Sequence, residues 1–118
     1  ARVFGPADLA RRGGTIAWLV NADAVVAVDT QYVDTAAACL EGLNQRSGNR
    51  PIDLVFNTHH HADHTGGNGV FKAAAKKIVA HSRVPELMKQ VAAQQPNAAA
   101  PVLPTATFAV GLPALMPV

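Results

Sequence analysis

A run of histidines between an apolar segment and a pair of glycines constrains what this chain can fold into and bind more than any other feature of the sequence. Four of its five histidines fall within six residues, in the run His59-His60-His61-Ala62-Asp63-His64. Side chains of an extended segment alternate with a period of two, so His59 and His61 point to the same side. Both can therefore reach one ion at the ~2.0–2.1 Å typical of Zn–N bonds. Asp63 and His64 follow about one turn later and can face a neighbouring ion.

The segments around this run alternate between strand and helix patterns. Residues 15–20 and 24–29 are short apolar runs that predict a β-hairpin. From Asp34 apolar residues recur every three or four positions, which predicts a helix that ends near Gly48. The later elements predicted in this way are a strand over 52–56, a loop over 57–68, a weak helix over 69–75, a strand over 78–80, a helix over 82–95 and a strand over 105–110.

This order predicts an α/β fold with parallel crossovers. In such sheets ligands gather beyond the carboxyl ends of the strands, and the histidine run directly follows the predicted strand 52–56. Gly66 and Gly67 allow a sharp bend without a Cβ clash, and Asn68 is expected to cap the next helix. Pattern and topology therefore place a site at the same edge of the sheet.

Composition narrows the class of protein. A chain of 118 residues that is 49% hydrophobic and 15% charged has the composition of one modest globular core. Its net charge of +2 and scattered basic residues predict no nucleic-acid partner. No run approaches the ~20 apolar residues of a membrane span, so no membrane partner is expected. Cys39 stands alone, which excludes an intrachain disulfide and leaves the compartment of a soluble protein open, bacterial-type cytoplasm or periplasm.

The pattern H-x-H-x-D-H with its tail Thr65-Gly66-Gly67-Asn68 resembles the signature of the metallo-β-lactamase superfamily, which includes β-lactamases, thioesterases and lactonases. The resemblance extends to the hairpin, helix and strand before the motif and the strand after it. It implies one αβ half of an αββα sandwich, with a mixed sheet and helices on one face. Residues 1–118 would then be a single half domain, truncated before the second half.

The resemblance also implies roles for individual residues. His59 and His61 match ligands of a first metal, and Asp63 and His64 match ligands of a second. The implied cofactor is zinc, as two ions, with iron or manganese as alternatives. Asp63 would be catalytic, orienting a metal-activated hydroxide that attacks a carbonyl of a small-molecule substrate. Asp29 matches an aspartate that supports the ligands from behind, and a turn-capping role is the alternative.

Two other histidines are interpreted as non-ligands. His60 falls on the variable position of the motif, and His81 ends a strand at a position that is usually structural in the family. The family's later ligands, two histidines and an aspartate, have no counterpart, since no histidine follows His81 and the only acidic residue after Asp63 is Glu86. Two ligands per ion would hold metal weakly, because a catalytic zinc usually has about three.

A half sandwich predicts an unpartnered apolar sheet face, which favours association. The uncharged stretch 90–118 is consistent with a buried segment. We therefore expect a homodimer packed sheet to sheet, or a missing C-terminal half. Two functions stay open: a zinc-dependent hydrolase, and a non-catalytic metal-binding fragment or assembly half. Whether the chain alone is an enzyme is not decided, and a nuclease is disfavoured because no basic cluster is present.

Overall fold

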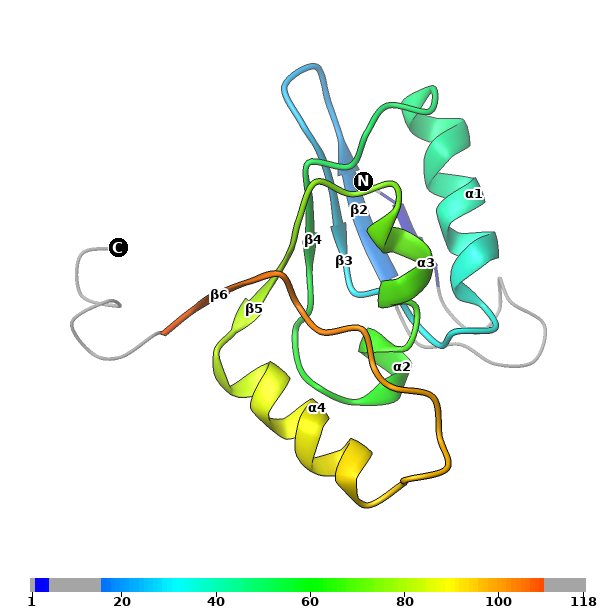
Figure 1. The fold of residues 1–118 in the computed structure, drawn as a ribbon. Coiled ribbons are helices and arrows are strands. Elements are labelled where there is room, and N and C mark those ends of the chain that lie inside the picture. Colours follow the sequence, from blue (N-terminus) through cyan, green and yellow to red (C-terminus); the bar gives the residue numbers. More distant parts are fainter. Residues whose placement is uncertain (1, 5–15, 110–118) are drawn as a thin grey trace.

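The computed structural model describes residues 2–4 and 16–109, which form a six-stranded sheet in the order β1-β2-β3-β4-β5-β6 (Figure 1). The first three strands are antiparallel neighbours, and the β3–β4, β4–β5 and β5–β6 pairs are parallel. The strands are β1 (Arg2–Phe4), β2 (Ile16–Val20), β3 (Val25–Val28), β4 (Leu54–Phe56), β5 (Ile78–His81) and β6 (Ala106–Phe108). The helices are α1 (Ala36–Ser47), α2 (Ala62–Thr65), α3 (Asn68–Lys72) and α4 (Arg83–Ala93).

Local chemistry explains the predicted hairpin and the end of the first helix. Asn21 closes the β2–β3 turn, because its Oδ1 accepts hydrogen bonds of 2.9 Å from the backbone N–H groups of Asp23 and Ala24. Gly48 ends α1 in the left-handed conformation, at φ 68°, and its N–H donates to the carbonyl of Asn44. Both predictions from the sequence are confirmed.

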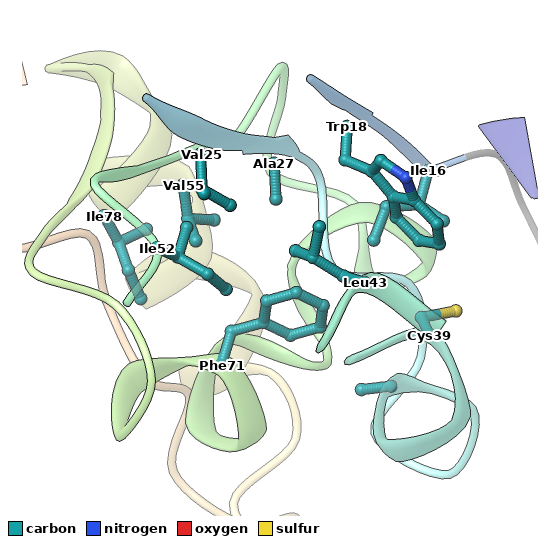
Figure 2. Packing of buried hydrophobic residues seen from close by; sticks show 11 residues of the cluster. Ile16, Trp18, Val25, Ala27, Cys39, Leu43, Ile52, Val55, Phe71 and Ile78 are labelled. Atoms are coloured by element: carbon teal, nitrogen blue, oxygen red, sulfur yellow. The ribbon is translucent and has the colours of Figure 1, made fainter. Parts of the chain in front are cut away.

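The hydrophobic core covers one face of the sheet. Alternate strand residues such as Trp18, Val25 and Val55 are buried there. Figure 2 shows Phe71 of α3 and Leu43 of α1 pointing at these strand residues from the helical side. A smaller cluster continues this layer, in which Val84 and Met88 of α4 pack against Ala80 of β5. The expected mixed α/β sheet with helices on one face is therefore confirmed.

The opposite face of the sheet is apolar and remains partly exposed. Its residues alternate with the buried ones along each strand and include Leu19, Val26, Phe56, Val79 and Phe108. Leu19 is 47% exposed, and the rings of Phe56 and Phe108 lie 5.8 Å apart. No helix in the described ranges 2–4 and 16–109 is long and apolar enough to cross a membrane.

Three elements differ from the sequence-based prediction. The strand predicted over 52–56 begins only at Leu54, because Ile52 makes an isolated bridge and the Asp53 carboxylate accepts the backbone N–H of Val25. The predicted loop 57–68 contains the one-turn helix α2, and β1 was not predicted. The strand predicted over 105–110 is present as β6, and its last residue lies outside the described ranges.

Candidate metal centre

The candidate site lies where the parallel strands β3 and β4 end (Figure 1). Asp29 follows β3, and its backbone N–H donates to the carbonyl of Phe56 at 2.7 Å. The histidine motif begins three residues after Phe56. Because the two strands are parallel neighbours, their carboxyl ends bring Asp29 beside the start of the motif. The position expected from the topology is therefore the observed one.

A one-turn helix folds the motif back on itself. The backbone N–H groups of His64 and Thr65 both donate to the carbonyl of His61, at 2.9 and 3.1 Å. The hydroxyl of Thr65 also donates toward the carbonyls of His60 and His61, at 3.2 and 3.1 Å. This turn, α2, carries Asp63 and His64 back toward the extended part of the motif.

Three side chains converge as a result. His59, Asp63 and His64 each offer one donor atom, and these atoms all lie within 4.8 Å of one another. His64 Nε2 is 3.2 Å from Asp63 Oδ2, and the imidazole centroids of His59 and His64 are 3.9 Å apart. Two imidazoles and one carboxylate, each partly buried, match the number and type of protein ligands at a catalytic zinc. The donor set therefore fits a metal ion.

Asp29 orients the imidazole of His64 through a hydrogen bond to Nδ1, the ring nitrogen that does not face Asp63. Its carboxylate is buried, with 4% of the residue exposed, and Oδ2 lies 2.7 Å from His64 Nδ1. Its Oδ1 accepts the backbone N–H of Thr58 at 2.7 Å. A carboxylate can only accept hydrogen bonds, so His64 carries its proton on Nδ1. Its Nε2, which lies 3.2 Å from Asp63 Oδ2, faces the cluster and is the nitrogen that would bind a metal.

Thr58 extends the same arrangement to His59. The Thr58 hydroxyl donates to Asp29 Oδ2 at 2.7 Å and lies 3.0 Å from His59 Nδ1. A hydroxyl has one proton, and here the carboxylate accepts it, so Thr58 must accept a hydrogen bond from His59 Nδ1. His59 therefore also presents its unprotonated Nε2. One buried carboxylate sets the tautomer of both imidazoles.

The electrostatics of the cluster favour the neutral imidazole of His59. The pKa of His59 is lowered below its ordinary value, first because burial disfavours the imidazolium cation. Nearby His64 and His61 lower this pKa further, and Asp29 and Asp63 oppose them. A metal binds the neutral form of imidazole, so this shift removes competition from protons.

The other histidines lie outside this group of donor atoms. The imidazole centroid of His61 is 4.9 Å from that of His59, edge to face, and His61 is exposed. His60 packs beside it with centroids 4.5 Å apart. His81 accepts the backbone N–H of Arg83 and packs against Phe108. The structure thus gathers His59 with Asp63 and His64, where the resemblance paired His59 with His61.

A buried asparagine, whose role the sequence-based analysis did not identify, fixes the backbone around the site. Asn68 is fully buried, and its Nδ2 donates to Asn57 Oδ1 at 2.8 Å and to the carbonyl of Val102 at 3.0 Å. Its Oδ1 accepts from Thr30 Oγ1 at 2.9 Å and from Asn57 Nδ2 at 3.0 Å. The expected capping role for Asn68 is wrong: Gly67 occupies the N-cap position of α3. The one available signal was that asparagines flank the motif on both sides.

The two glycines before Asn68 are required by close packing. A Cβ on Gly67 would lie 2.2 Å from the carbonyl oxygen of Thr30 and 2.4 Å from Ala36 Cβ. A Cβ on Gly66 would lie 2.6 Å from the carbonyl oxygen of Ala62. All three distances are well inside van der Waals contact, so the absence of a side chain at these two positions has a direct steric reason.

Comparison with known proteins agrees with this geometry. The sequence profile described as the metallo-beta-lactamase superfamily matches residues 10–115. The chain belongs to the metallo-beta-lactamase superfamily. No curated protein matches the sequence closely enough to be named as a relative.

Solved metallo-β-lactamase structures share the fold. A metallo-β-lactamase from Hirschia baltica is similar with a TM-score of 0.62 and 17% identity, over 82% of this chain and 41% of that one. MEM-A1, a subclass B3 enzyme isolated from a soil metagenome library, gives 0.62 and 19%, over 86% and 41%. FIM-1 from Pseudomonas aeruginosa, in its mono-zinc form, gives 0.59 and 18%, over 83% and 40%. This metallo-β-lactamase-type chain therefore spans about two fifths of the length of these structures.

Proposed function

We propose that this chain is the metal-binding part of a zinc-dependent hydrolase that cleaves a lactam, thioester or lactone bond in a small molecule. The observation that carries this proposal is the convergence of His59, Asp63 and His64 on one point, with Asp29 behind them. Membership in the metallo-β-lactamase superfamily supports the class of reaction. Iron and manganese are the alternative metals, since both accept imidazole and carboxylate ligands.

The number of ligands that this chain supplies is enough for one metal ion, which would bind before any second ion. Three protein ligands and a water complete a catalytic zinc site, and His59, Asp63 and His64 supply the three. A second ion would need further donors, and His61 is the nearest histidine, with its ring 4.9 Å from that of His59. We infer that His61 joins the site when a second ion binds.

The residues of this chain would divide the chemical work between them. A bound zinc ion supplies a Lewis acid that activates water and polarises a carbonyl group. Asp63 is the more exposed carboxylate, so it can accept a hydrogen bond from the attacking water and orient it. Asp29 is engaged by Thr58 and His64, and it keeps the metal-binding nitrogen of both imidazoles unprotonated.

The proposal also includes a partner that packs on the partly exposed face of the sheet. The partly exposed apolar face, with Leu19, Phe56 and Phe108, is of the kind that marks an interface. The shares of the solved structures covered, 40–41%, support a C-terminal half as the missing cover. A second copy of this chain, packed sheet to sheet, is the alternative. The second candidate function, a non-catalytic assembly half, is favoured by the same partial coverage.

Isothermal titration calorimetry with zinc tests the metal site. We expect the wild-type chain to bind zinc and His59→Ala to lose most of that affinity, because one of three donors is removed. His81→Ala is the matched control, since His81 lies outside the cluster and contacts Phe108. Equal zinc affinity in wild type and His59→Ala would refute the site. Inductively coupled plasma analysis of the purified chain identifies the metal.

Activity and assembly need separate measurements. The zinc-loaded chain is assayed with a chromogenic β-lactam, a thioester and a lactone, and Asp63→Asn is the variant expected to lose turnover. Size-exclusion chromatography with light scattering reports whether the chain dimerises. Zinc binding with no turnover on any of the three substrates, in the monomer and in any dimer, would favour the assembly half over the hydrolase.

A further inference from the structure

A cavity lies beside the metal centre and is not accounted for by the ligands. It is lined mainly by α2, α4 and residues 98–102, is open on one side, and has a volume of about 490 Å³. Cavities of roughly 300–1,000 Å³ are the size that proteins use to bury most of a small ligand. In Figure 1 residues 98–102 run, in orange, from the far end of α4 past α2 toward β6. The space is therefore large enough for a substantial part of a small molecule.

The walls of this cavity are mostly apolar. Among the described residues that line it, none is Asp, Glu, Lys or Arg. Met88, Val91 and Ala92 contribute one stripe of α4, at the three- and four-residue spacing that places side chains on the same face of a helix. Met88 belongs to the buried cluster with Ala80 and also lines the cavity, and Val91 is 41% exposed. A large apolar side chain is thus exposed to the cavity.

The second wall explains the uncharged stretch of the sequence. The sequence-based expectation that the stretch 90–118 is buried is wrong for residues 93–101, which are exposed although they contain four alanines, two prolines and no charged residue. Charged groups in such a wall would lose hydration whenever an apolar ligand covered them. The wall is also held in place, because the carbonyl of Val102 accepts a hydrogen bond from the buried Asn68. An exposed, uncharged segment that is anchored at Val102 is suited to an apolar ligand.

His61 connects this cavity to the metal centre. His60 and His61 line the cavity, and the ring of His61 lies 4.9 Å from that of His59 in the metal cluster. A ligand in the cavity would therefore have its polar end at the histidines and its apolar end between α4 and residues 98–102. This arrangement places the end nearest the histidines within reach of the metal centre.

We propose that the cavity binds the apolar acyl group of the substrate, so that the carbonyl at its end reaches the metal centre. The inference rests on the proposed hydrolase function and assigns its substrate class, an acyl compound whose acyl group is uncharged and hydrophobic. Each buried methylene contributes about 0.8 kcal/mol, which is about a fourfold gain in affinity. Affinity should therefore rise with acyl chain length until the cavity is full.

Calorimetric titration with straight-chain carboxylates, the products of acyl hydrolysis, tests the cavity directly. Acetate, butyrate, hexanoate and octanoate are titrated into the metal-free chain and into the zinc-loaded chain. We expect affinity to rise about fourfold per methylene in both forms, because none of the three proposed zinc ligands, His59, Asp63 and His64, lines the cavity. A dissociation constant that is independent of chain length would overturn the proposal.

Two matched variants separate the cavity from the rest of the helix. Ala92 lines the cavity and Ala93 does not, and both are in the last turn of α4. Ala92→Phe should fill part of the cavity and lower octanoate affinity more than tenfold, with acetate affinity unchanged. Ala93→Phe should leave both affinities within about twofold of wild type. The same loss in both variants would overturn the assignment.

A pair of variants that each introduce one carboxylate gives a second measurement, which does not depend on filling the cavity. Val91→Asp places a charge in the wall and should abolish the chain-length dependence, whereas Gln90→Asp adds the same charge to an exposed residue that does not line the cavity. A dimer that buries this surface and excludes octanoate would overturn the proposal. Binding that depends on chain length, without turnover, would support the cavity proposal and contradict the hydrolase proposal. Turnover without a preference for chain length would support the hydrolase proposal and contradict the cavity proposal.

Discussion

Replacing Asp29 by asparagine tests the metal centre without removing a proposed metal ligand. Asp29 sits at φ 66°, a left-handed conformation that asparagine tolerates at least as well as aspartate, so the backbone should be unaffected. The carboxylate receives three hydrogen bonds of 2.7 Å, from the Thr58 N–H, the Thr58 hydroxyl and His64 Nδ1. An amide has only one accepting oxygen, so its NH₂ group must face at least one of these donors.

The expected cost follows from that mismatch. If the amide NH₂ faces His64, the imidazole must move its proton from Nδ1 to Nε2, and the lone pair that faces the cluster is lost. A hydrogen bond to a charged group contributes about 1.5–3 kcal/mol. At about 1.4 kcal/mol per tenfold change, we expect the zinc dissociation constant of Asp29→Asn to rise about 10- to 100-fold.

The assay is zinc titration against a competing chromophoric chelator, with thermal unfolding of the metal-free chain measured in parallel. Asp23→Asn is the control, because it makes the same substitution at an exposed residue of the β2–β3 turn. It should leave the zinc dissociation constant unchanged. If Asp29→Asn binds zinc within about twofold of wild type while both variants stay folded, the tautomer argument is wrong.

Two further predictions concern packing. Burial raises the pKa of the Cys39 thiol to about 11, so only about one molecule in a thousand carries the thiolate at pH 8, and Ellman's reagent should react slowly until denaturant is added. Fast labelling of the native chain would contradict this burial. Gly67→Ala should lower the free energy of unfolding by about 2 kcal/mol or more in urea titration, because its Cβ would lie 2.2 Å from a backbone oxygen. Gly69→Ala, whose nearest neighbour is a side-chain carbon at 3.3 Å, should change it by less than about 1 kcal/mol, and equal losses would refute the steric argument.

Periodicity in the sequence predicted most of the sheet and the longer helices. The hairpin, α1 and β5 carry regular apolar spacing and clear stop signals, and the structure contains them. The four-residue helix α2 has no such period, since it is held by the carbonyl of His61 and the Thr65 hydroxyl. The strand β1 is three residues long and exists by pairing with β2, a contact that local sequence cannot indicate.

The metal centre was predictable in position and less so in arrangement. The histidine run predicted it after the strand that ends at Phe56, and His59, Asp63 and His64 converge there. The expected pairing of His59 with His61 assumed an extended segment, whereas the chain turns into α2 directly after His61. That turn brings His64 to His59. The part played by Thr58 depends on a carboxylate 29 residues earlier, so no local pattern could reveal it.

The buried amide of Asn68 links the candidate metal centre to the wall of the cavity. On one side it is hydrogen bonded to Asn57, two residues before His59, and to Thr30, which follows Asp29. On the other side it holds the carbonyl of Val102, at the end of the cavity wall. A fully satisfied buried amide has few alternative positions, because any shift leaves a polar group unpaired. The Asn68 side chain therefore ties the backbone beside the candidate metal centre to the end of the cavity wall at Val102.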